Sequence, residues 1–459
     1  MNLLVNSNVF RRQVKYLSKV INCEIAIVGG GLNGFTFAQI ASSHEVIKNK
    51  SIVLIDNGPR LHNETSKNPR ARTVALNNKT ISLFKELKLW DGLSKRIQPI
   101  KRINVFEDFS SSYLTLKLNE KDSNICYIVE NDHLLRILTS NVEKSSTKVL
   151  YNHRVDNIES NGYSKLKVTD KSTNNSIDIQ ANLIIGADGI NSIIRKKSQI
   201  PTISWHKDLM AVGSILKMGD NYDQTVAWQK FLDKGPIAIL PLTSEYASLV
   251  WSTTREEAKR LMEMSENDFL HQVNSMLHKK TNGPHVLDAR FVEFFKNLNY
   301  STEKFSVSHD VPQVIDILSK SRGAFPLGFS HVANYVGDNF ALIGDSAHRI
   351  LPLAGLGYNL GVGDSLSLVE KMSHAVTSGF KINDISHLKE YESERMRAVI
   401  PIMAFIEAIN ISYSKPNIGL PTYLDPINIV RSFGFSLFNT IPLLKQIAIK
   451  SASRGEIKF

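Results

Sequence analysis

The sequence predicts an α/β protein that carries an inserted β-rich domain and ends in a helical segment. A short apolar run at 25–28 precedes a glycine-rich turn and a helical pattern, which is the order of a buried parallel strand, a loop and a helix. The same order recurs from residue 340 onward. Between these two units, residues 201–324 contain short β-rich runs separated by turn residues, without a βαβ rhythm, which indicates an antiparallel sheet.

Composition is that of a globular enzyme. The chain has 459 residues, of which 42% are hydrophobic and 22% charged, enough for two or three domains or one large α/β unit. No apolar run reaches 18 residues, so we expect a soluble or peripheral protein. The two cysteines, Cys23 and Cys126, form no metal-binding spacing, which favours a compartment that does not depend on disulfides.

The formal net charge is +11, which is typical of proteins that meet an anionic membrane, a nucleic acid or an acidic partner, or of a Lys-rich composition alone. No dense basic block with interleaved aromatic residues and no nucleic-acid-binding motif is present, so no nucleic acid is expected as a partner. Residues 1–22 contain Arg and Lys, scattered apolar residues and no acidic residue, which predicts a mitochondrial transit peptide. A disordered basic N-terminus is the alternative.

The stretch "EIAIVGGGLNG" carries the first site. Gly29, Gly31 and Gly34 form G-x-G-x-x-G directly after a strand pattern and before a helical one, and a second strand pattern, "SIVLI", ends at Asp56. The glycines permit a tight turn, close approach of a pyrophosphate and close packing of the helix on the strand. The carboxylate of Asp56 can accept hydrogen bonds from ribose hydroxyl groups. The segment therefore predicts a Rossmann-like three-layer domain that binds a dinucleotide, without separating NAD from FAD.

Two further strand ends carry a carboxylate. The run Leu183–Ile185 leads to Asp188 in "GADG", for which a simple turn is the alternative, and the run Phe340–Ile343 leads to Asp345. A helical pattern begins near Gly357. Ligands of open α/β sheets lie at the carboxyl ends of the strands. Two helix N-termini and several strand-end carboxylates therefore suit one long cofactor, with its diphosphate on one loop and its ring system on the other.

These motifs together resemble the FAD-dependent aromatic hydroxylases of the para-hydroxybenzoate hydroxylase type. Within that superfamily, "GPIAILPLTSEYASLVWST", "FPLGFSHVANYVGDNFALIGDSAHRILPLAG" and "YESERMRAVIPIM" resemble the mitochondrial branch of the ubiquinone-biosynthesis monooxygenases. The resemblance covers nearly the whole chain from residue 23. It implies FAD as cofactor and the following contacts: the diphosphate on Gly29, Gly31 and Gly34, the adenosine ribose on Asp56, a cofactor contact by Arg72 in "RTVAL", the "DG" carboxylate at Asp188, the ribityl chain on Asp345, and the isoalloxazine along Pro352, Gly355, Gly357 and Asn359.

The chain departs from its relatives at two positions beside the expected flavin ring. Leu351 and Leu356 stand where relatives usually have His and Gln, in "HPLAGQG". If the flavin contacts here are mainly backbone N–H groups, the change is tolerable. If the Gln orients the substrate or the flavin, the activity or the redox potential changes.

The resemblance also implies a domain layout. The FAD-binding domain would span 23–200 and 325–400, with the β-rich substrate domain at 201–324 and a C-terminal helical region at 401–459. Apolar residues recur at helical spacing within 426–453, where Pro442 should separate two helices. These helices are expected either to contact a membrane or to pack on the body of the protein.

Such enzymes are reduced, bind O₂ as a flavin hydroperoxide and deliver a hydroxyl group to an aromatic ring, here a polyprenylated hydroxybenzoate-type intermediate. The chemistry requires no metal or catalytic triad, and no residue is assigned a catalytic role. We expect a ferredoxin-type electron donor rather than NAD(P)H, assembly with other ubiquinone-biosynthesis proteins, and a peripheral location on the matrix face of the mitochondrial inner membrane. His206, Trp228 and Trp251 are candidates for lining the ring pocket; core or surface roles are the alternative for each.

Two other functions share this fold. An FAD-dependent reductase of an isoprenoid substrate would consume no O₂, and a non-enzymatic carrier of prenylated proteins would hold no FAD. Carriers lack a working "GD" aspartate, so Asp345 argues against that function.

Overall fold

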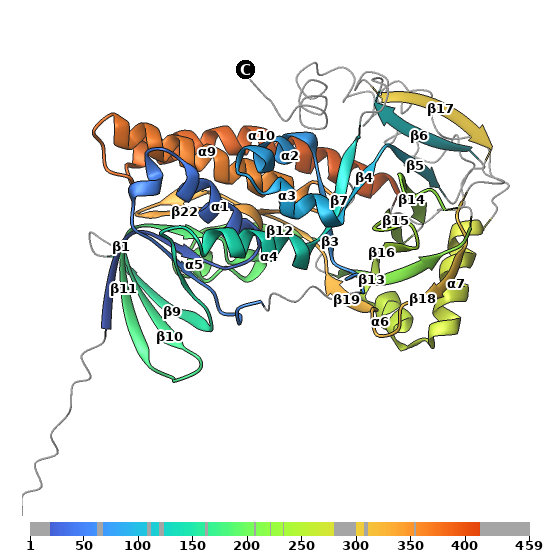
Figure 1. The fold of residues 1–459 in the computed structure, drawn as a ribbon, viewed down its shortest axis with the longest axis horizontal. Helices are drawn as coiled ribbons and strands as arrows, with labels where there is room; N and C mark the ends of the chain where they lie inside the picture. Colours follow the sequence, from blue (N-terminus) through green and yellow to red (C-terminus); the bar gives the residue numbers. More distant parts are fainter. Residues whose placement is uncertain are drawn as a thin grey trace, which may run out of the picture.

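The computed structural model describes residues 19–61, 68–107, 112–118, 124–160, 164–205, 208–220, 222–232, 234–279, 300–306, 311–352 and 355–413. It contains two large sheets, one at each end of the molecule, with long helices running along the first (Figure 1). The predicted fold class is confirmed: an α/β cofactor domain is joined to a β-rich domain.

The first sheet has the strand order β21-β22-β11-β1-β2-β8, and its strands from β22 to β8 run parallel. Ile52–Ile55 of β2 is buried along its whole length, because helices and a hairpin cover both faces of the sheet. The strands are β1 (Lys19–Val28), β2 (Ile52–Ile55), β8 (Lys148–Leu150), β11 (Ser176–Gly186), β21 (Val336–Gly337) and β22 (Phe340–Leu342), with the hairpin β9 (His153–Ser160) and β10 (Ser164–Asp170) beside β11.

Strand β1 corrects one predicted boundary. It begins at Lys19 and pairs with β11 from Ile177 onward, so the last residues of the expected transit segment 1–22 belong to the folded sheet. The β-branched Val20 and Ile21 suit this extension of the ladder. Residues 1–18 lie outside the described residues, and a transit function for them stays a prediction.

Helices pack on this sheet as a layer that places both glycine loops at one edge. The helix α1 (Leu32–Ser43) follows the first loop and packs against α4 (Asn131–Val142) and α9 (Gly357–Thr377). The helix α10 (Ile385–Tyr413) runs alongside α9 (Figure 1). Since α10 continues through Pro401, the predicted boundary between 325–400 and 401–459 falls inside a helix. The helices predicted within 426–453 lie outside the described residues.

The second sheet has the order β17-β6-β5-β14-β15-β16-β13-β18, with β19 also paired to β13. Its strands are β5 (Arg102–Glu107), β6 (Ser112–Leu118), β13 (Leu209–Met218), β14 (Val226–Leu232), β15 (Gly235–Pro241), β16 (Tyr246–Thr254), β17 (Tyr300–Ser306), β18 (Val314–Ile317) and β19 (Gly323–Pro326). Two strands therefore come from before residue 201. The first of them, β5, pairs with the edge of β14, whose backbone groups would otherwise lack partners, and β6 pairs with β5. Phe325, expected to re-enter the first domain, lies in β19 of this sheet.

Two helical segments are interrupted. The segment 78–93 divides into α2 (Asn78–Glu86) and α3 (Trp90–Leu93), because Lys88 adopts a φ of 58°. The segment 255–278 divides into α6 (Arg255–Glu263) and α7 (Glu266–His278), because Ser265 caps the second by accepting a 3.1 Å hydrogen bond from the Asp268 N–H.

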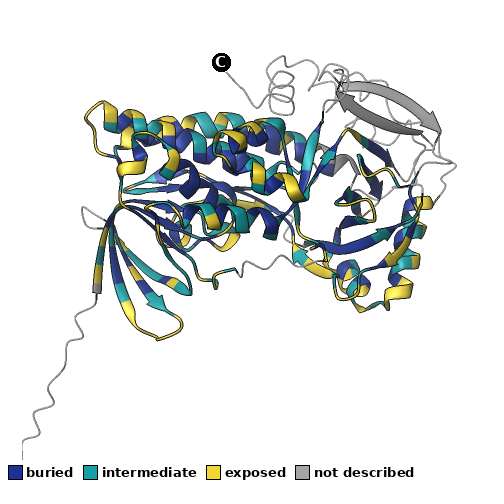
Figure 2. Cartoon of the chain, in the orientation of Figure 1, coloured by how far each residue is buried: buried dark blue, intermediate teal, exposed yellow. Residues whose placement is uncertain are grey.

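The core of the second domain lies between the sheet and α6 and α7. Buried residues line this face and the inner strands of the first sheet (Figure 2). Two small sheets complete the fold: β3 (Thr73–Leu76), β4 (Ile97–Ile100) and β7 (Cys126–Glu130), found where the two large sheets meet (Figure 1), and β12 (Thr202–Trp205), β20 (Phe329–Val332) and β23 (His348–Arg349).

Candidate cofactor-binding site

The first glycine loop is packed backbone against backbone. Gly29 has a φ of +109°, and a Cβ there would lie 2.4 Å from the carbonyl oxygen of Ala187. A Cβ on Gly34 would lie 1.8 Å from the carbonyl oxygen of Gly29. These two positions therefore accept only glycine, because carbonyl groups of neighbouring loops occupy the space of a side chain.

Gly31 differs from its neighbours, because no heavy atom lies within 4 Å of the position of its Cβ. It is the residue before α1, and no side chain caps the first turn of that helix. The free N–H groups of the turn and the positive end of the helix dipole face this open space. The space and the donors fit a diphosphate.

Asp56 lies beside this loop at the end of β2. Its carboxylate accepts a 3.3 Å hydrogen bond from the Gly58 N–H, and a Cβ on Gly30 would lie 2.5 Å from its Cγ. Burial raises the pKa of Asp56 despite hydrogen bonds from neighbouring backbone N–H groups. A half-buried acceptor close to the diphosphate loop fits a ribose hydroxyl.

The second loop carries Asp345 in the 3₁₀ turn η4 (Gly344–Ser346), directly after β22. Among the described residues, no hydrogen bond is formed by its carboxylate. Burial raises its pKa, and the charges of Arg349 and His348 oppose this only in part. An acceptor without a protein partner fits the hydroxyl groups of a ribityl chain.

Asp188, expected to contact the cofactor, has both carboxylate oxygens engaged within the protein. One accepts a 2.6 Å hydrogen bond from the Ile193 N–H, and the other a 3.1 Å hydrogen bond from the Ser346 hydroxyl. Ser346 also accepts a 2.8 Å hydrogen bond from the Gly189 N–H. The side chain of Asp188 therefore holds the "DG" and "GD" loops together, which sequence reasoning missed.

The beginning of α9 forms the far end of the site. Gly355 has a φ of +60°, and a Cβ there would lie 2.6 Å from Cβ of Ala75 in β3. The Asn359 amide donates to the carbonyl oxygens of Ala75 and Gly355 at 2.7 and 3.0 Å. Its oxygen accepts from the Asn77 N–H and the Thr80 hydroxyl at 3.0 and 2.9 Å. Because all of these partners belong to the protein, only the backbone of Asn359 is left to face a cofactor.

The other residues expected at this end lie around the same turn. Gly357 is the first residue of α9, and Pro352 is exposed. Leu351 is 3% exposed and packs in an apolar cluster that Leu356 also contacts. The cluster joins the loop to β20 and to α10; its buried members are Ala211, Leu327, Phe329, Leu351, Leu360, Val399, Ile402, Met403 and Ile406. At both positions where the chain departs from the family pattern, the Leu side chain packs against apolar neighbours. A polar side chain there would need a buried hydrogen-bond partner.

Arg72 lies just before β3, at the contact between the two domains. Its guanidinium is 5.6 Å from the ring centroid of Phe325 in β19. The preceding residue is fixed by the buried Ser248, whose hydroxyl donates a 2.8 Å hydrogen bond to the carbonyl oxygen of Ala71. The second sheet therefore holds the segment that carries this exposed cation.

Trp228 and Trp251, the described candidates for lining the ring pocket, do not lie where Arg72 meets Phe325 between the two domains. Trp228 and Trp251 are buried in the cluster that α6 and α7 cover. The adjacent residues Ala227 and Val250 point to the other face of the sheet, because side chains alternate along a strand. The structure therefore favours the alternative, core packing, for both Trp residues. His206 lies outside the described residues.

Sequence reasoning missed a joint between the two glycine loops. The Thr36 hydroxyl of α1 lies 2.6 Å from the Tyr358 hydroxyl of α9 in a buried hydrogen bond. One turn earlier, Asn33 fills the notch left by two glycines: a Cβ on Gly344 or Gly361 would lie 1.9 or 2.3 Å from its amide. Asn33 and Thr36 share one face of α1 at helical spacing, which is the only signal the sequence offers.

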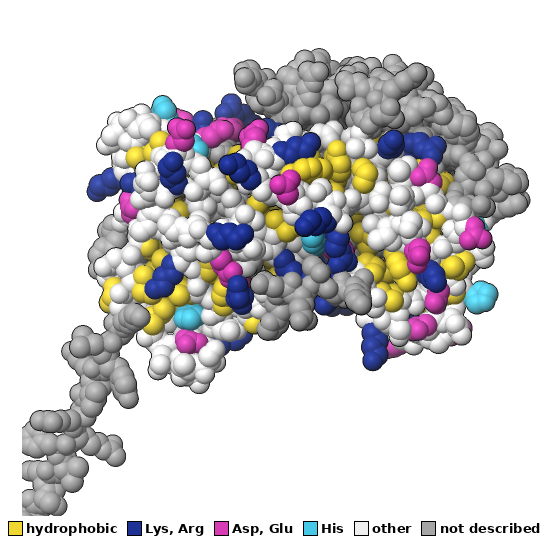
Figure 3. Space-filling model, in the orientation of Figure 1, with side chains coloured by type: hydrophobic (Ala, Val, Ile, Leu, Met, Phe, Trp, Pro, Cys, Tyr) yellow, Lys and Arg dark blue, Asp and Glu magenta, His cyan; other side chains and the backbone are white. Residues whose placement is uncertain are grey.

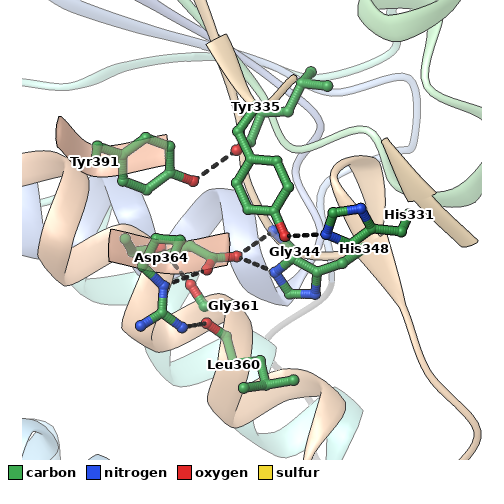
Figure 4. A network of polar contacts seen from close by, with 11 residues as sticks. His331, Tyr335, Gly344, His348, Leu360, Gly361, Asp364 and Tyr391 are labelled. Atoms are coloured by element: carbon green, nitrogen blue, oxygen red, sulfur yellow. Dashed lines mark hydrogen bonds and ion pairs between the residues drawn. The ribbon is translucent and has the colours of Figure 1, made fainter. Parts of the chain in front are cut away.

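The second loop also rests on a buried polar network (Figure 4). The fully buried Asp364 of α9 accepts hydrogen bonds from the Gly344 N–H at 2.8 Å and from Arg395 Nε at 2.8 Å, and His348 Nε2 lies 2.7 Å away. Burial alone would raise the pKa of Asp364, but the neighbouring His348 and Arg395 hold it at about 2. No sequence motif indicated this network.

Comparison with known proteins identifies the family. A family model for an FAD binding domain matches residues 22–299 and 309–405. The mitochondrial ubiquinone biosynthesis monooxygenase COQ6 of Drosophila melanogaster is 32% identical over 438 residues, covering 94% of this chain and 89% of the relative. The human protein of the same name is 32% identical over 446 residues, covering 94% and 92%. The chain belongs to the ubiquinone-biosynthesis monooxygenases.

Solved structures of low sequence identity share the fold. Pseudomonas aeruginosa PqsL in complex with 2-aminobenzoylacetate has a TM-score of 0.67 at 17% identity, covering 91% of this chain and all of that one. Aklavinone-11 hydroxylase with FAD and aklavinone has a TM-score of 0.61 at 15% identity, covering 86% and 70%. As a ubiquinone-biosynthesis monooxygenase, the chain is a flavoprotein with FAD as its cofactor.

The relatives bear mitochondrial names, which supports a mitochondrial location for this monooxygenase. Within the described residues, no helix has both the length and the apolar character needed to cross a membrane.

Proposed function

We propose that the protein hydroxylates the aromatic ring of a polyprenylated hydroxybenzoate-type intermediate of ubiquinone biosynthesis, with FAD and O₂. The observation that carries the proposal is the match to ubiquinone biosynthesis monooxygenases over 94% of the chain. The geometry supports it, because two loops and two strand-end carboxylates line one edge of the first sheet, as a long cofactor requires.

The proposed cofactor contacts follow from the groups left free. The first turn of α1 would bind the diphosphate, Asp56 the adenosine ribose, and Asp345 the ribityl hydroxyls. The turn around Gly355 and Gly357 would lie along the isoalloxazine through its backbone, and Arg72 would place a cation at the rim. FAD, when bound, supplies the oxygen-transfer chemistry; the protein orients the ring and excludes water.

The apolar cluster beside the second loop supports a substrate with an apolar tail. Leu356, at the start of α9, and Phe325, in β19, are half-buried at its margin. A Gln side chain at position 356 would lose its hydration against such a tail at a cost in free energy. The apolar side chain of Leu356 carries no such cost. We propose that Leu356, packed on the cluster that contains the buried Leu351, forms an apolar wall at the flavin end of the substrate pocket.

A ferredoxin-type protein is the proposed electron donor. The chain carries a formal charge of +11, which attracts an acidic partner. Lys and Arg side chains lie over the face drawn in Figure 3, several of them where the two domains meet. Reduction by an acidic ferredoxin should slow steeply with rising salt, whereas direct reduction by NADPH should not.

Two measurements test the proposed reaction. The purified protein should show the absorption of bound flavin, and the reduced protein should consume O₂ in the presence of a prenylated hydroxybenzoate. Mass spectrometry of cells that lack their own hydroxylase should then find a product with one added oxygen atom. A product that gains only hydrogen would support an isoprenoid reductase instead, and a colourless protein that takes up no FAD would support a carrier.

We further propose peripheral contact with the matrix face of the inner membrane and assembly with other ubiquinone-biosynthesis proteins. The apolar tail of the proposed substrate resides in the membrane, which supports both. Binding to vesicles that contain anionic lipid, and release by salt or carbonate from mitochondrial membranes, would test the location. Co-purification from mitochondria would test the assembly.

A further inference from the structure

The carboxylate of Asp345 forms no hydrogen bond among the described residues, and only the charges of Arg349 and His348 act on it. Its direction is therefore set by the backbone beneath it. That backbone is unusual: Gly344, the preceding residue, has a φ of +57°. A residue in this region changes the direction of the chain within one step. Whatever fixes Gly344 therefore also fixes where Asp345 points.

Asp364 is the group that fixes Gly344. Its Oδ2 accepts a hydrogen bond from the Gly344 N–H at 2.8 Å, and this bond joins α9 to the second loop. The same oxygen meets His348 Nε2 at 2.7 Å, only four residues after Gly344. Both ends of the turn that carries Asp345 are therefore tied to one carboxylate (Figure 4).

Arg395 of α10 holds Asp364 in turn. Its Nε donates to Asp364 Oδ1 at 2.8 Å, and its Nη2 donates to the carbonyl oxygen of Leu360 at 3.2 Å. Gly363 makes room for this guanidinium, because a Cβ at that position would lie 2.8 Å from Nη2. A carboxylate with paired charge and hydrogen bonds on both oxygens keeps one orientation.

The network continues away from the loop. The Tyr335 ring centroid lies 5.7 Å from that of His348, and the Tyr335 hydroxyl lies 3.0 Å from His331 Nε2. Glu392 of α10 accepts hydrogen bonds from the Tyr335 and Val336 N–H groups at 2.7 and 3.2 Å. Glu392 is thus a second buried carboxylate on the same helix layer that does not contact the loop.

From these contacts we infer that Asp364, held by Arg395, is a positioning residue that aims Asp345 at the cofactor and so tunes the affinity and the reduction potential of the flavin. The inference rests on the proposed role of Asp345. It does not require Asp364 to touch the cofactor.

The test measures FAD dissociation constants, flavin midpoint potentials and apo-protein melting for a double-mutant cycle. Asp364→Asn keeps the volume but replaces an acceptor with an amide donor. We expect FAD to dissociate about tenfold more readily, with a shifted midpoint potential. Since Asp364 acts through Asp345, the variant with both Asp345→Asn and Asp364→Asn should bind FAD no more weakly than Asp345→Asn alone.

Glu392→Gln is the matched control, because it should lower apo-protein melting without changing the affinity or the potential. If Asp364→Asn does not fold, Gly363→Ala displaces Arg395 by a single methyl group and should weaken FAD binding in the same direction. Additive effects in the cycle, or equal shifts in Glu392→Gln, would overturn the inference. So would normal affinity and potential in both Asp364→Asn and Gly363→Ala. Unchanged FAD affinity in Asp345→Asn would instead refute the proposed role of Asp345.

Discussion

The two glycine loops of this monooxygenase lie at one sheet edge but are held by different forces. At the first loop, carbonyl groups press against Gly29 and Gly34, and the carboxylate of Asp56 lies against Gly30 between them. At the second, the buried Asp364 holds the turn through hydrogen bonds and an ion pair. Gly29 and Gly34 are therefore fixed by shape, whereas the turn of the second loop is fixed by an ionised carboxylate and should respond more strongly to acid.

The largest effect is expected at the first loop. In Gly34→Ala, the new methyl carbon would lie 1.8 Å from the Gly29 carbonyl oxygen, and neither backbone can move without parting α1 from β1. We expect destabilisation of about 3 kcal/mol or more. Chemical denaturation of the apo-protein measures it.

Gly31→Ala is the matched control, because nothing lies within 4 Å of its Cβ position. The variant should unfold like the wild type while binding FAD more weakly, as its methyl group meets the diphosphate. Equal destabilisation by both substitutions would show that the loop is not held by close backbone contact.

The next effect concerns pH at the second loop. The pKa of Asp364 is about 2 in the folded protein, against an ordinary value of 3.8. A depressed carboxyl pKa stabilises the fold above the unfolded pKa, and this stability is lost as pH falls from about 4 to about 2. We expect Asp364→Asn to remove this part of the acid dependence and to cost about 3 kcal/mol at neutral pH, because Arg395 stays buried without its partner.

Urea denaturation of the two apo-proteins between neutral and acid pH checks this. The free energies of unfolding should converge as the pH falls, because the wild type loses what the variant already lacks. Parallel curves would mean that Asp364 is not the titrating group.

A smaller effect, of opposite sign, is expected at Asp345. Burial raises its pKa, so the charged form costs stability at neutral pH, and this cost grows as pH rises from 3.8 through the raised pKa. Asp345→Asn should therefore raise the melting temperature of the apo-protein while weakening FAD binding. A fall in apo-protein melting would show that the carboxylate has a protein partner and is not reserved for a ligand.

The contrast between the loops also explains what sequence could reveal. The pattern of β1, its glycines and α1 is local, and so is that of β22, Asp345 and α9, because apolar periodicity and turn glycines act over short distances. The network around Asp364 joins residues from 331 to 395, whose spacing follows no motif. A buried ion pair depends on which helices become neighbours, and that is decided by the whole fold.

The errors have the same origin. Residues 102–107 and 112–118 were predicted to belong to the first domain, but β5 pairs with β14, more than a hundred residues later, and β6 pairs with β5. Trp228 and Trp251 have the right residue type for a ring pocket, yet the face of the sheet that they occupy is covered by α6 and α7. Asp188 has the expected position, while its hydrogen bonds depend on Ser346 from the other loop.

The smallest effect tests whether the two loops act as one site. Tyr358→Phe removes the buried 2.6 Å hydrogen bond to Thr36, which ties the helices of the two loops together across 322 positions of sequence. The expected cost to apo-protein stability is about 1 kcal/mol, because the Thr36 hydroxyl loses a buried partner. The variant that combines Tyr358→Phe with Thr36→Val should recover part of that cost.

If the hydrogen bond between Thr36 and Tyr358 sets the distance between the loops, Tyr358→Phe should also weaken binding of intact FAD. Binding of ADP-ribose should stay unchanged, because ADP-ribose engages the first loop alone. Equal weakening for both ligands would place the effect in the first loop and would show that the second is positioned without this bond.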